Sequence, residues 1–149
     1  MKQKYIDAHI KVAEIYASLS TARRLQVGAI VVKDNRVISI GYNGMPSGWD
    51  NNCESEATEF NLVTKSRTGT GKLTTRPEVL HAETNAIAKL ARSNENGLNA
   101  TMFITHAPCL DCAKLIYQSG ISNVYYRNAY RESTGVEFLL KSGVEVEQI

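Results

Sequence analysis

The stretch ATMFITHAPCLDCAKLIYQSGISNVYYRN (residues 100–128) predicts a strand, a helix and a second strand in succession. Residues 100–106 and 122–128 are rich in β-branched and aromatic side chains, which favour strands. Residues 109–120 carry apolar side chains at helical spacing and end at a glycine. A strand–helix–strand unit places its two strands in parallel in one sheet, so this stretch predicts an α/β fold.

The segments on either side continue this alternation along the chain. We expect helices over residues 3–19, 79–94 and 135–143. We expect strands over residues 27–32, 37–42 and 144–149. The polar residues KDNR (33–36) favour a turn between the first two strands. Residues 1–149 are therefore expected to form a single domain, a three-layer α/β/α fold whose mixed sheet has about five strands, the last ones partly parallel.

Residues 43–78 have the least regular pattern. GMPSGWDNN (44–52) has the composition of a loop, with two glycines and a proline. We expect a short helix over 58–66 and a polar, mobile loop over 67–77. A loop-rich insertion of this length is often functional.

Composition excludes several classes of function. The formal net charge is only +2, from 17 basic and 15 acidic residues, and no long basic block is present, so broad nucleic-acid binding is not expected. The longest aliphatic run, VGAIVV (27–32), is far too short to span a membrane. The N-terminal segment lacks the features of a signal peptide, so we expect a cytoplasmic protein. Three cysteines in such a chain argue against a disulfide framework.

Two of the three cysteines, Cys109 and Cys112, lie three residues apart at the start of a predicted helix. Such a pair can be a disulfide, a redox pair, half of a structural zinc site or half of a catalytic one. Helix N-termini favour thiolates, and the spacing places both sulfurs on one helical face. His81, at the start of the preceding predicted helix, adds a third ligand of the kind that zinc prefers.

A fourth protein ligand is hard to find for this set. No second CxxC or HxxxH pattern exists, and His106 belongs to the loop before Pro108. An open position would hold a water molecule, whose pKa zinc lowers to roughly 7. Glu83, two residues after His81, can reach that water without being a ligand and can carry its proton to a substrate nitrogen. The pattern favours one catalytic zinc ion per chain.

The combination HAE (81–83) and PCLDC (108–112) matches H-x-E…P-C-x-x-C, the signature of zinc-dependent nucleobase deaminases. Over almost its whole length the chain resembles the cytidine deaminase-like superfamily and, within it, the deoxycytidylate (dCMP) deaminases. The segments that carry the resemblance are QVGAIVV, GYNGMPSG, HAETNAI, APCLDCAKLIYQSGISNVYY and GVEFLLKSGVEVEQI. GYNGMPSG (41–48) is the most diagnostic of them.

The resemblance implies hydrolysis of dCMP to dUMP and ammonia, which supplies thymidylate synthesis. It implies that His81, Cys109 and Cys112 hold zinc and that Glu83 transfers protons to the pyrimidine ring and the departing amine. Asn43 would bind the deoxyribose or phosphate region. The remaining substrate contacts expected from the resemblance are Ala82, Thr105, His106, Ala107 and Tyr130. Arg24, basic and in the loop before the first strand, is our candidate for the phosphate.

The resemblance also implies regulation and assembly. Many members of the family are hexamers that dCTP activates and dTTP inhibits. The effector segment of the family corresponds to Gly41, Tyr42, Asn43 and Gly44, and a position associated with subunit contacts corresponds to Arg92. Some relatives hold a second, structural zinc ion. Here Ala22 replaces one of its cysteines, and Cys53 alone cannot form that site.

Two other functions fit parts of the sequence. A deaminase acting on a base in tRNA or single-stranded DNA would need a basic, aromatic groove, which the near-neutral charge and GYNGMPSG disfavour. A nucleotide-binding module with a non-catalytic zinc would not need Glu83.

Overall fold

The computed structural model describes residues 1–149. In chain order the elements are α1 (Gln3–Ala17), β1 (Gly28–Lys33), β2 (Arg36–Tyr42), β3 (Glu54–Asn61), β4 (Ser66–Thr75), α2 (Ala82–Ala91), β5 (Thr101–His106), α3 (Leu110–Gln118), β6 (Asn123–Asn128), α4 (Thr134–Lys141) and β7 (Glu145–Gln148). Apart from β3 and β4, these elements follow the predicted order.

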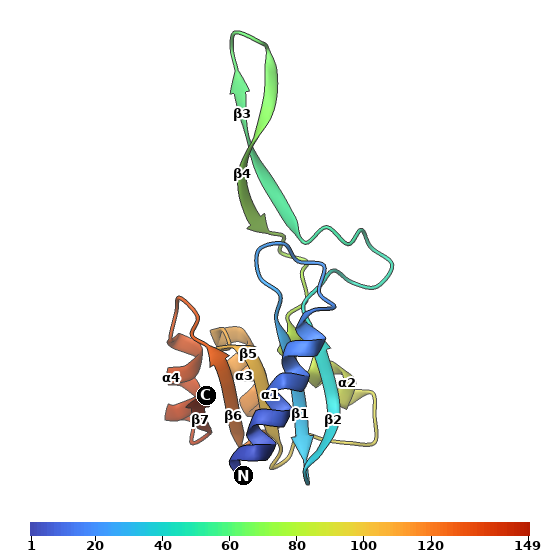
Figure 1. Ribbon diagram of the computed structural model, residues 1–149, viewed down its shortest axis with the longest axis vertical. Coiled ribbons are helices and arrows are strands. Elements are labelled where there is room, and N and C mark those ends of the chain that lie inside the picture. Colours follow the sequence, from blue (N-terminus) through green and yellow to red (C-terminus); the bar gives the residue numbers. More distant parts are fainter.

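A five-stranded mixed sheet with the order β2-β1-β5-β6-β7 forms the centre of the molecule (Figure 1). β1 pairs antiparallel with both β2 and β5, while β5, β6 and β7 are parallel. The predicted turn after β1 has positive φ at Asp34 and Asn35, as a two-residue type I′ hairpin turn requires. The sheet therefore confirms the predicted strand number and the parallel C-terminal part.

Helices cover both faces of the sheet, and each face has its own apolar core. On one face α1 packs its buried Ile6, Ile10 and Ala13 against residues of β1 and against Phe103 of β5. On the other face α2, α3 and α4 contribute to a larger core that includes Ala86 and Ile116. Burial of side chains on both faces explains why β1 is apolar over nearly its whole length. The expected three-layer α/β/α arrangement is confirmed.

The structure that we expected for residues 58–75 is wrong. Instead of a short helix and a mobile loop, β3 and β4 form an antiparallel hairpin that extends away from the body of the molecule (Figure 1). Asn61 accepts hydrogen bonds from the backbone N–H groups of Val63 and Thr64, and Lys65 has positive φ, so a turn interrupts the apparent helix. Only residues 43–53 and the short stretch before α2 are irregular, as expected for this insertion.

No helix of the structure combines the length and the apolar character that crossing a membrane requires.

The contact between β2 and α2 leaves no room for a side chain at Gly41. A Cβ atom there would lie 2.1 Å from the carbonyl oxygen of Ala82 and 2.7 Å from the backbone nitrogen of Ala86. The first turn of α2, which carries His81 and Glu83 at its start, is thus seated directly on the backbone of β2.

We therefore expect Gly41→Ala to lower the free energy of unfolding by about 1–3 kcal/mol, the range for overpacking in a core. Urea denaturation followed by circular dichroism measures the change. Gly44→Ala is the matched control, because a Cβ atom at Gly44 meets nothing within 4 Å. Equal stability of the two variants would show that α2 can shift away from β2 without cost.

Candidate active site

The candidate site lies where the N-termini of α2 and α3 meet. His81 is the N-cap of α2 and Cys109 is the N-cap of α3, while Glu83 and Cys112 lie in the first turns of these helices. Free backbone N–H groups and the helix dipole make such positions favourable for thiolates and carboxylates. The sequence placed all four residues at helix starts, and the structure confirms this.

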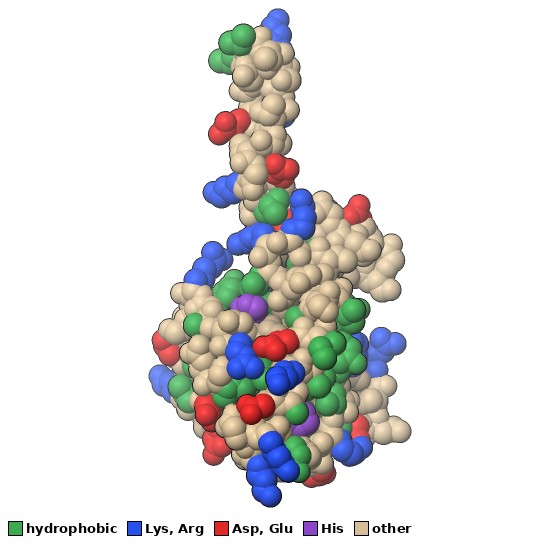
Figure 2. All heavy atoms as spheres, viewed as in Figure 1, with side chains coloured by type: hydrophobic (Ala, Val, Ile, Leu, Met, Phe, Trp, Pro, Cys, Tyr) green, Lys and Arg blue, Asp and Glu red, His purple; other side chains and the backbone are tan.

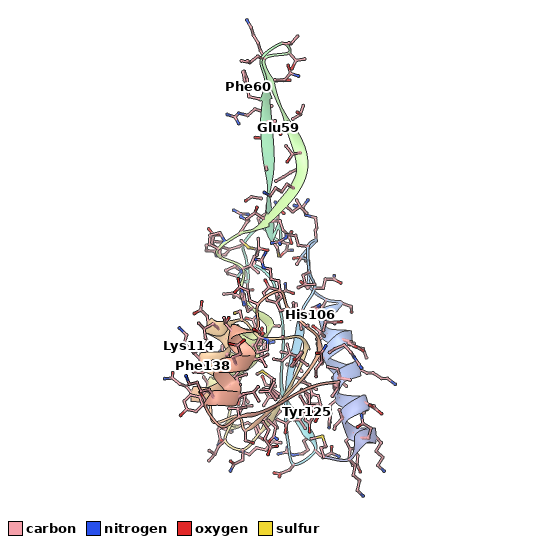
Figure 3. All side chains as sticks on the ribbon, turned by 90° about the vertical axis from the view of Figure 1, so that its left-hand side faces the viewer. Glu59, Phe60, His106, Lys114, Tyr125 and Phe138 are labelled. Carbon is pink, nitrogen blue, oxygen red and sulfur yellow. The ribbon has the colours of Figure 1, made fainter.

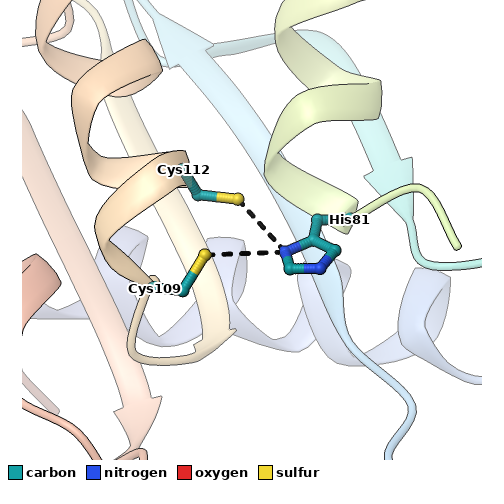
Figure 4. A group of neighbouring side chains, drawn as sticks. All are labelled: His81, Cys109 and Cys112. Atoms are coloured by element: carbon teal, nitrogen blue, oxygen red, sulfur yellow. Dashed lines mark hydrogen bonds between the residues drawn. The ribbon is translucent and has the colours of Figure 1, made fainter. Parts of the chain in front are cut away.

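Three of these side chains converge on one point (Figure 4). The Nδ1 atom of His81 lies 3.3 Å from the Sγ atom of Cys112 and 3.7 Å from the Sγ atom of Cys109. The three ligand atoms all lie within 4.8 Å of one another. Tetrahedral zinc with Zn–S of about 2.3 Å and Zn–N of about 2.0 Å separates nitrogen from sulfur by about 3.5 Å. One nitrogen and two sulfurs at these distances fit a zinc ion.

The turn that presents Cys109 is held by close contact with α4. A Cβ atom at Gly135 would lie 2.1 Å from the carbonyl oxygen of Pro108 and 2.8 Å from that of Cys109. Backbone therefore packs directly on backbone at this point. The contact fixes the start of α3, and with it the direction of both cysteine side chains.

Of the three ligands, only Cys109 is shifted toward the form that binds a metal, because its pKa is lowered while those of Cys112 and His81 are raised. Hydrogen bonds from Cys112 and then from His81 lower the pKa of Cys109 to about 4. The hydrogen bond to Cys109 and burial raise the pKa of Cys112, since one pair of neighbouring thiols cannot easily carry two negative charges. The hydrogen bond to Cys109 also raises the pKa of His81. A metal ion would replace the proton that these groups share.

Glu83 is the acid–base candidate. Its side chain is buried, and desolvation raises the pKa of its carboxyl group from 4.5 to about 7. A carboxyl group whose pKa lies near neutrality can both accept and donate a proton under working conditions. Glu83 lines the same pocket as His81 and Cys109. This position is the one that the sequence predicted for a proton carrier.

A pocket of about 310 Å³ opens beside this group, large enough for a small ligand. It lies at the edge of the sheet where β5 and β6 end and β1 begins, because Ala29 of β1 pairs with Ile104 of β5. Loops from distant parts of the sequence meet there. The predicted substrate residues that line it are Arg24, Asn43, Ala82, His106, Ala107 and Tyr130.

The other predicted residues lie outside the pocket wall. Thr105 is buried, and its hydroxyl group contacts the backbone N–H of Gly28 and the Nδ1 atom of His106. Gly41 and Tyr42 are the last residues of β2, and Gly44, two residues farther along, pairs through its backbone with Leu80, next to His81. Arg92 is an exposed residue at the C-cap of α2.

Asn43 organises the wall of the pocket. Its side-chain amide donates to the carbonyl oxygen of Leu25 at 2.9 Å and accepts from the backbone N–H of Val27 at 2.8 Å. The loop that carries Arg24 is therefore fastened to the end of β2. Burial lowers the pKa of His106, another residue of the pocket wall, so its ring is neutral near pH 7.

The sequence missed two charged residues of the pocket wall, Glu54 and Arg131. Arg131 follows Tyr130, and its guanidinium lies 5.7 Å from the centre of that tyrosine ring. Glu54 is the first residue of β3 and has only 1 % of its side chain exposed. The position of Arg131 directly after Tyr130, a predicted substrate residue, could have identified it as a residue of the pocket wall. Nothing in the local sequence distinguishes Glu54 from the exposed acids of the same strand.

Comparison with known proteins agrees with this geometry. The family model described as the cytidine and deoxycytidylate deaminase zinc-binding region matches residues 2–128. The chain is 31% identical to the deoxycytidylate deaminase of Enterobacteria phage T4, over 92% of this chain and 86% of that protein. It is 37% identical to the deoxycytidylate deaminase of Mus musculus, over 87% of this chain and 70% of that protein.

A solved structure extends the agreement to three dimensions. The crystal structure of the dCMP deaminase from the cyanophage S-TIM5 in complex with dCMP and dUMP superposes with a TM-score of 0.84 at 42% identity, and the match covers 100% of this chain and 99% of that chain. The chain therefore belongs to the cytidine and deoxycytidylate deaminase family of zinc-binding hydrolytic enzymes.

Proposed function

We propose that this chain catalyses the hydrolytic deamination of dCMP to dUMP and ammonia, with one zinc ion per chain. The observation that carries the proposal is the position of Glu83. This buried carboxyl group lies in one pocket with His81 and Cys109 of the metal-ligand set and with Arg24, a cation suited to a phosphate. A relative of known structure has been crystallised with dCMP and dUMP.

His81, Cys109 and Cys112 would hold the zinc ion, which acts as a Lewis acid and makes water a stronger nucleophile near neutral pH. The N-terminal position of each ligand keeps the set rigid, because helices α2 and α3 are both packed on the sheet. The pocket on the open side leaves space for the base of the nucleotide.

Glu83 carries the protons of the reaction. Its carboxylate takes a proton from the attacking water and gives it to the ring nitrogen N3 as oxygen adds at C4 of cytosine. A second proton passes from the added hydroxyl group to the exocyclic nitrogen, which leaves as ammonia when the C4–N bond breaks. The pKa of about 7 suits both directions of transfer.

The pocket wall supplies contacts for the rest of the nucleotide. The hydroxyl group of Thr105 accepts from the N–H of Gly28, so its own proton is free to bond to the Nδ1 atom of His106. Donation from Thr105 to Nδ1 would leave the Nε2–H of a neutral His106 as a donor to the edge of the base. Ala82 and Ala107 would contact the base through their backbone, while Asn43 and Tyr130 would border the sugar.

Regulation, assembly and location form a second part of the proposal. We expect dCTP to activate and dTTP to inhibit through the segment from Gly41 to Gly44, the dUMP to supply thymidylate synthesis, and the enzyme to act in the cytoplasm. We also expect a homo-oligomer, which by family resemblance would be a hexamer with Arg92 in a subunit contact. The projecting hairpin favours an oligomer, because two isolated strands are only marginally stable in water. Apolar side chains are exposed at its tip (Figure 2), namely Phe60, Leu62 and Val63.

The first test is ammonia release from dCMP, cytidine, dCTP and a cytosine-containing oligonucleotide, each with and without dCTP or dTTP as effector. We expect turnover of dCMP, raised by dCTP and suppressed by dTTP. In Glu83→Gln the kcat for dCMP should fall by at least about 100-fold, the contribution of a general acid–base, while zinc remains bound. Turnover of the oligonucleotide without turnover of dCMP would contradict the substrate assignment and leave the acid–base chemistry intact.

The second test concerns zinc stoichiometry. Elemental analysis of the purified protein should give one zinc per chain. Cys112→Ser should lose nearly all of this zinc, because an alcohol replaces one of three ligands. Cys53→Ser is the matched control, since Cys53 is buried near Thr21 and lies outside the ligand set. Two zinc ions in the unaltered protein, or loss of zinc in Cys53→Ser, would contradict a single site.

The third test concerns phosphate recognition. Arg24→Ala should raise the KM for dCMP by about tenfold or more, the effect of losing a hydrogen bond between charged groups, and change kcat less. Steady-state kinetics measure both constants. Arg36→Ala is the control, because Arg36 is an exposed residue of β2 that pairs with Glu95. An unchanged KM in Arg24→Ala would remove this assignment.

A further inference from the structure

We infer that Glu54 and Thr75, the paired residues at the base of the hairpin, position Arg24 for the 5′-phosphate of the substrate. Glu54 begins β3, Thr75 ends β4, and the two are opposite each other in the hairpin register. The inference rests on the proposed binding of the phosphate by Arg24. It gives the hairpin, which contributes nothing to the apolar cores, a part in the active site.

Glu54 holds the backbone of the loop before β1. Its Oε1 atom accepts hydrogen bonds from the backbone N–H groups of Arg23, at 2.8 Å, and Arg24, at 3.1 Å. The residue is almost completely buried, so these bonds lie largely beyond the reach of water. Two consecutive N–H groups bound to one carboxylate oxygen fix the direction in which the Arg24 side chain leaves the backbone.

Thr75 holds the other end of the same residue. Its Oγ1 atom accepts a hydrogen bond of 3.0 Å from Nη1 of Arg24. The backbone of Arg24 is thus bound by Glu54, and its guanidinium by the residue opposite Glu54. Both Thr75 and Glu54 also line the pocket. Arg24 is held at two points, which reduces the conformational freedom that a ligand would otherwise have to restrict.

Arg23 and Arg24 have different ionic surroundings. The Oε2 atom of Glu54 makes no hydrogen bond, but Nε of Arg23 lies 3.4 Å away. The carboxylate therefore has its ionic partner in Arg23. Arg24 forms no ion pair with an acidic side chain, and its one side-chain hydrogen bond goes to a neutral hydroxyl group. Its positive charge remains available for an anion in the pocket.

The base of the hairpin connects the loop that carries Arg24 to the projecting part of β3 and β4. Arg76 donates its backbone N–H to the carbonyl oxygen of Cys53 at 2.8 Å, which closes the hairpin directly below the pair. Glu59 and Phe60, farther along β3, lie well away from the body of the molecule (Figure 3). Only the base of the hairpin touches the nucleotide pocket, so Glu54 and Thr75 act there as positioning residues.

The test compares a ligand that has the phosphate with one that lacks it. The KM for dCMP and the inhibition constant of deoxycytidine as a competitor are measured for Glu54→Ala, Thr75→Val, Arg24→Ala and the double variant Glu54→Ala/Arg24→Ala. We expect Glu54→Ala to raise the KM for dCMP by about tenfold and Thr75→Val by about threefold, with kcat and the deoxycytidine constant nearly unchanged. The double variant should be no worse than Arg24→Ala alone, because Glu54 acts through Arg24.

Two further variants exclude general damage to the fold. Glu54→Gln keeps an oxygen that accepts both backbone N–H groups, so it should restore most of the affinity for dCMP. Glu59→Ala removes an exposed acid from the same strand and should behave like the unaltered enzyme.

Three results would overturn the inference. The first is an equal loss for dCMP and deoxycytidine in Glu54→Ala, and the second is multiplication of the two single effects in the double variant. The third is an Arg24→Ala effect on dCMP with no effect of either hairpin variant. An absence of any Arg24→Ala effect would instead remove the phosphate assignment on which the inference rests.

Discussion

The candidate active site depends on the meeting of two helix N-termini at one edge of a mixed sheet. His81 precedes α2 and Cys109 precedes α3, and the Nδ1 and Sγ atoms of the two residues lie 3.7 Å apart although 27 residues separate them in the chain. Free N–H groups at both helix starts support negative charge on sulfur and carboxylate. A metal ion adds to an electrostatic arrangement that the backbone has already prepared.

Close backbone contacts hold these helix starts in place. The first turn of α2 is seated on Gly41 of β2, and the turn before α3 is seated beside Gly135 of α4. In both contacts a single added methyl group would meet a carbonyl oxygen at van der Waals overlap. Catalytic groups need positions accurate to a fraction of an ångström, and tight packing of backbone against backbone gives that accuracy.

Two buried carboxyl groups, those of Glu83 and Glu54, line the pocket and have different surroundings. Glu83 has no cationic side chain bonded to it, and burial raises its pKa to about 7, which suits proton transfer. Glu54 binds two backbone N–H groups and lies beside Arg23, so its energy of burial is offset by fixed partners. The two carboxyl groups have different roles because their hydrogen-bond and ionic partners differ. Residue type does not separate them, since both are glutamates near the start of an element.

The sequence by itself determined the α/β class, the order of most elements and the position of His81, Glu83, Cys109 and Cys112 at the starts of two helices. Periodicity, turn residues and ligand spacing are local properties, so they can be read along the chain. Only the tertiary structure decided that residues 54–75 form a projecting hairpin and that Glu54 and Arg131 reach the pocket. Those features arise from contacts between segments tens of residues apart. Every residue of β3 after Glu54 is exposed, and the local sequence carries no sign that the first carboxylate of the strand is buried.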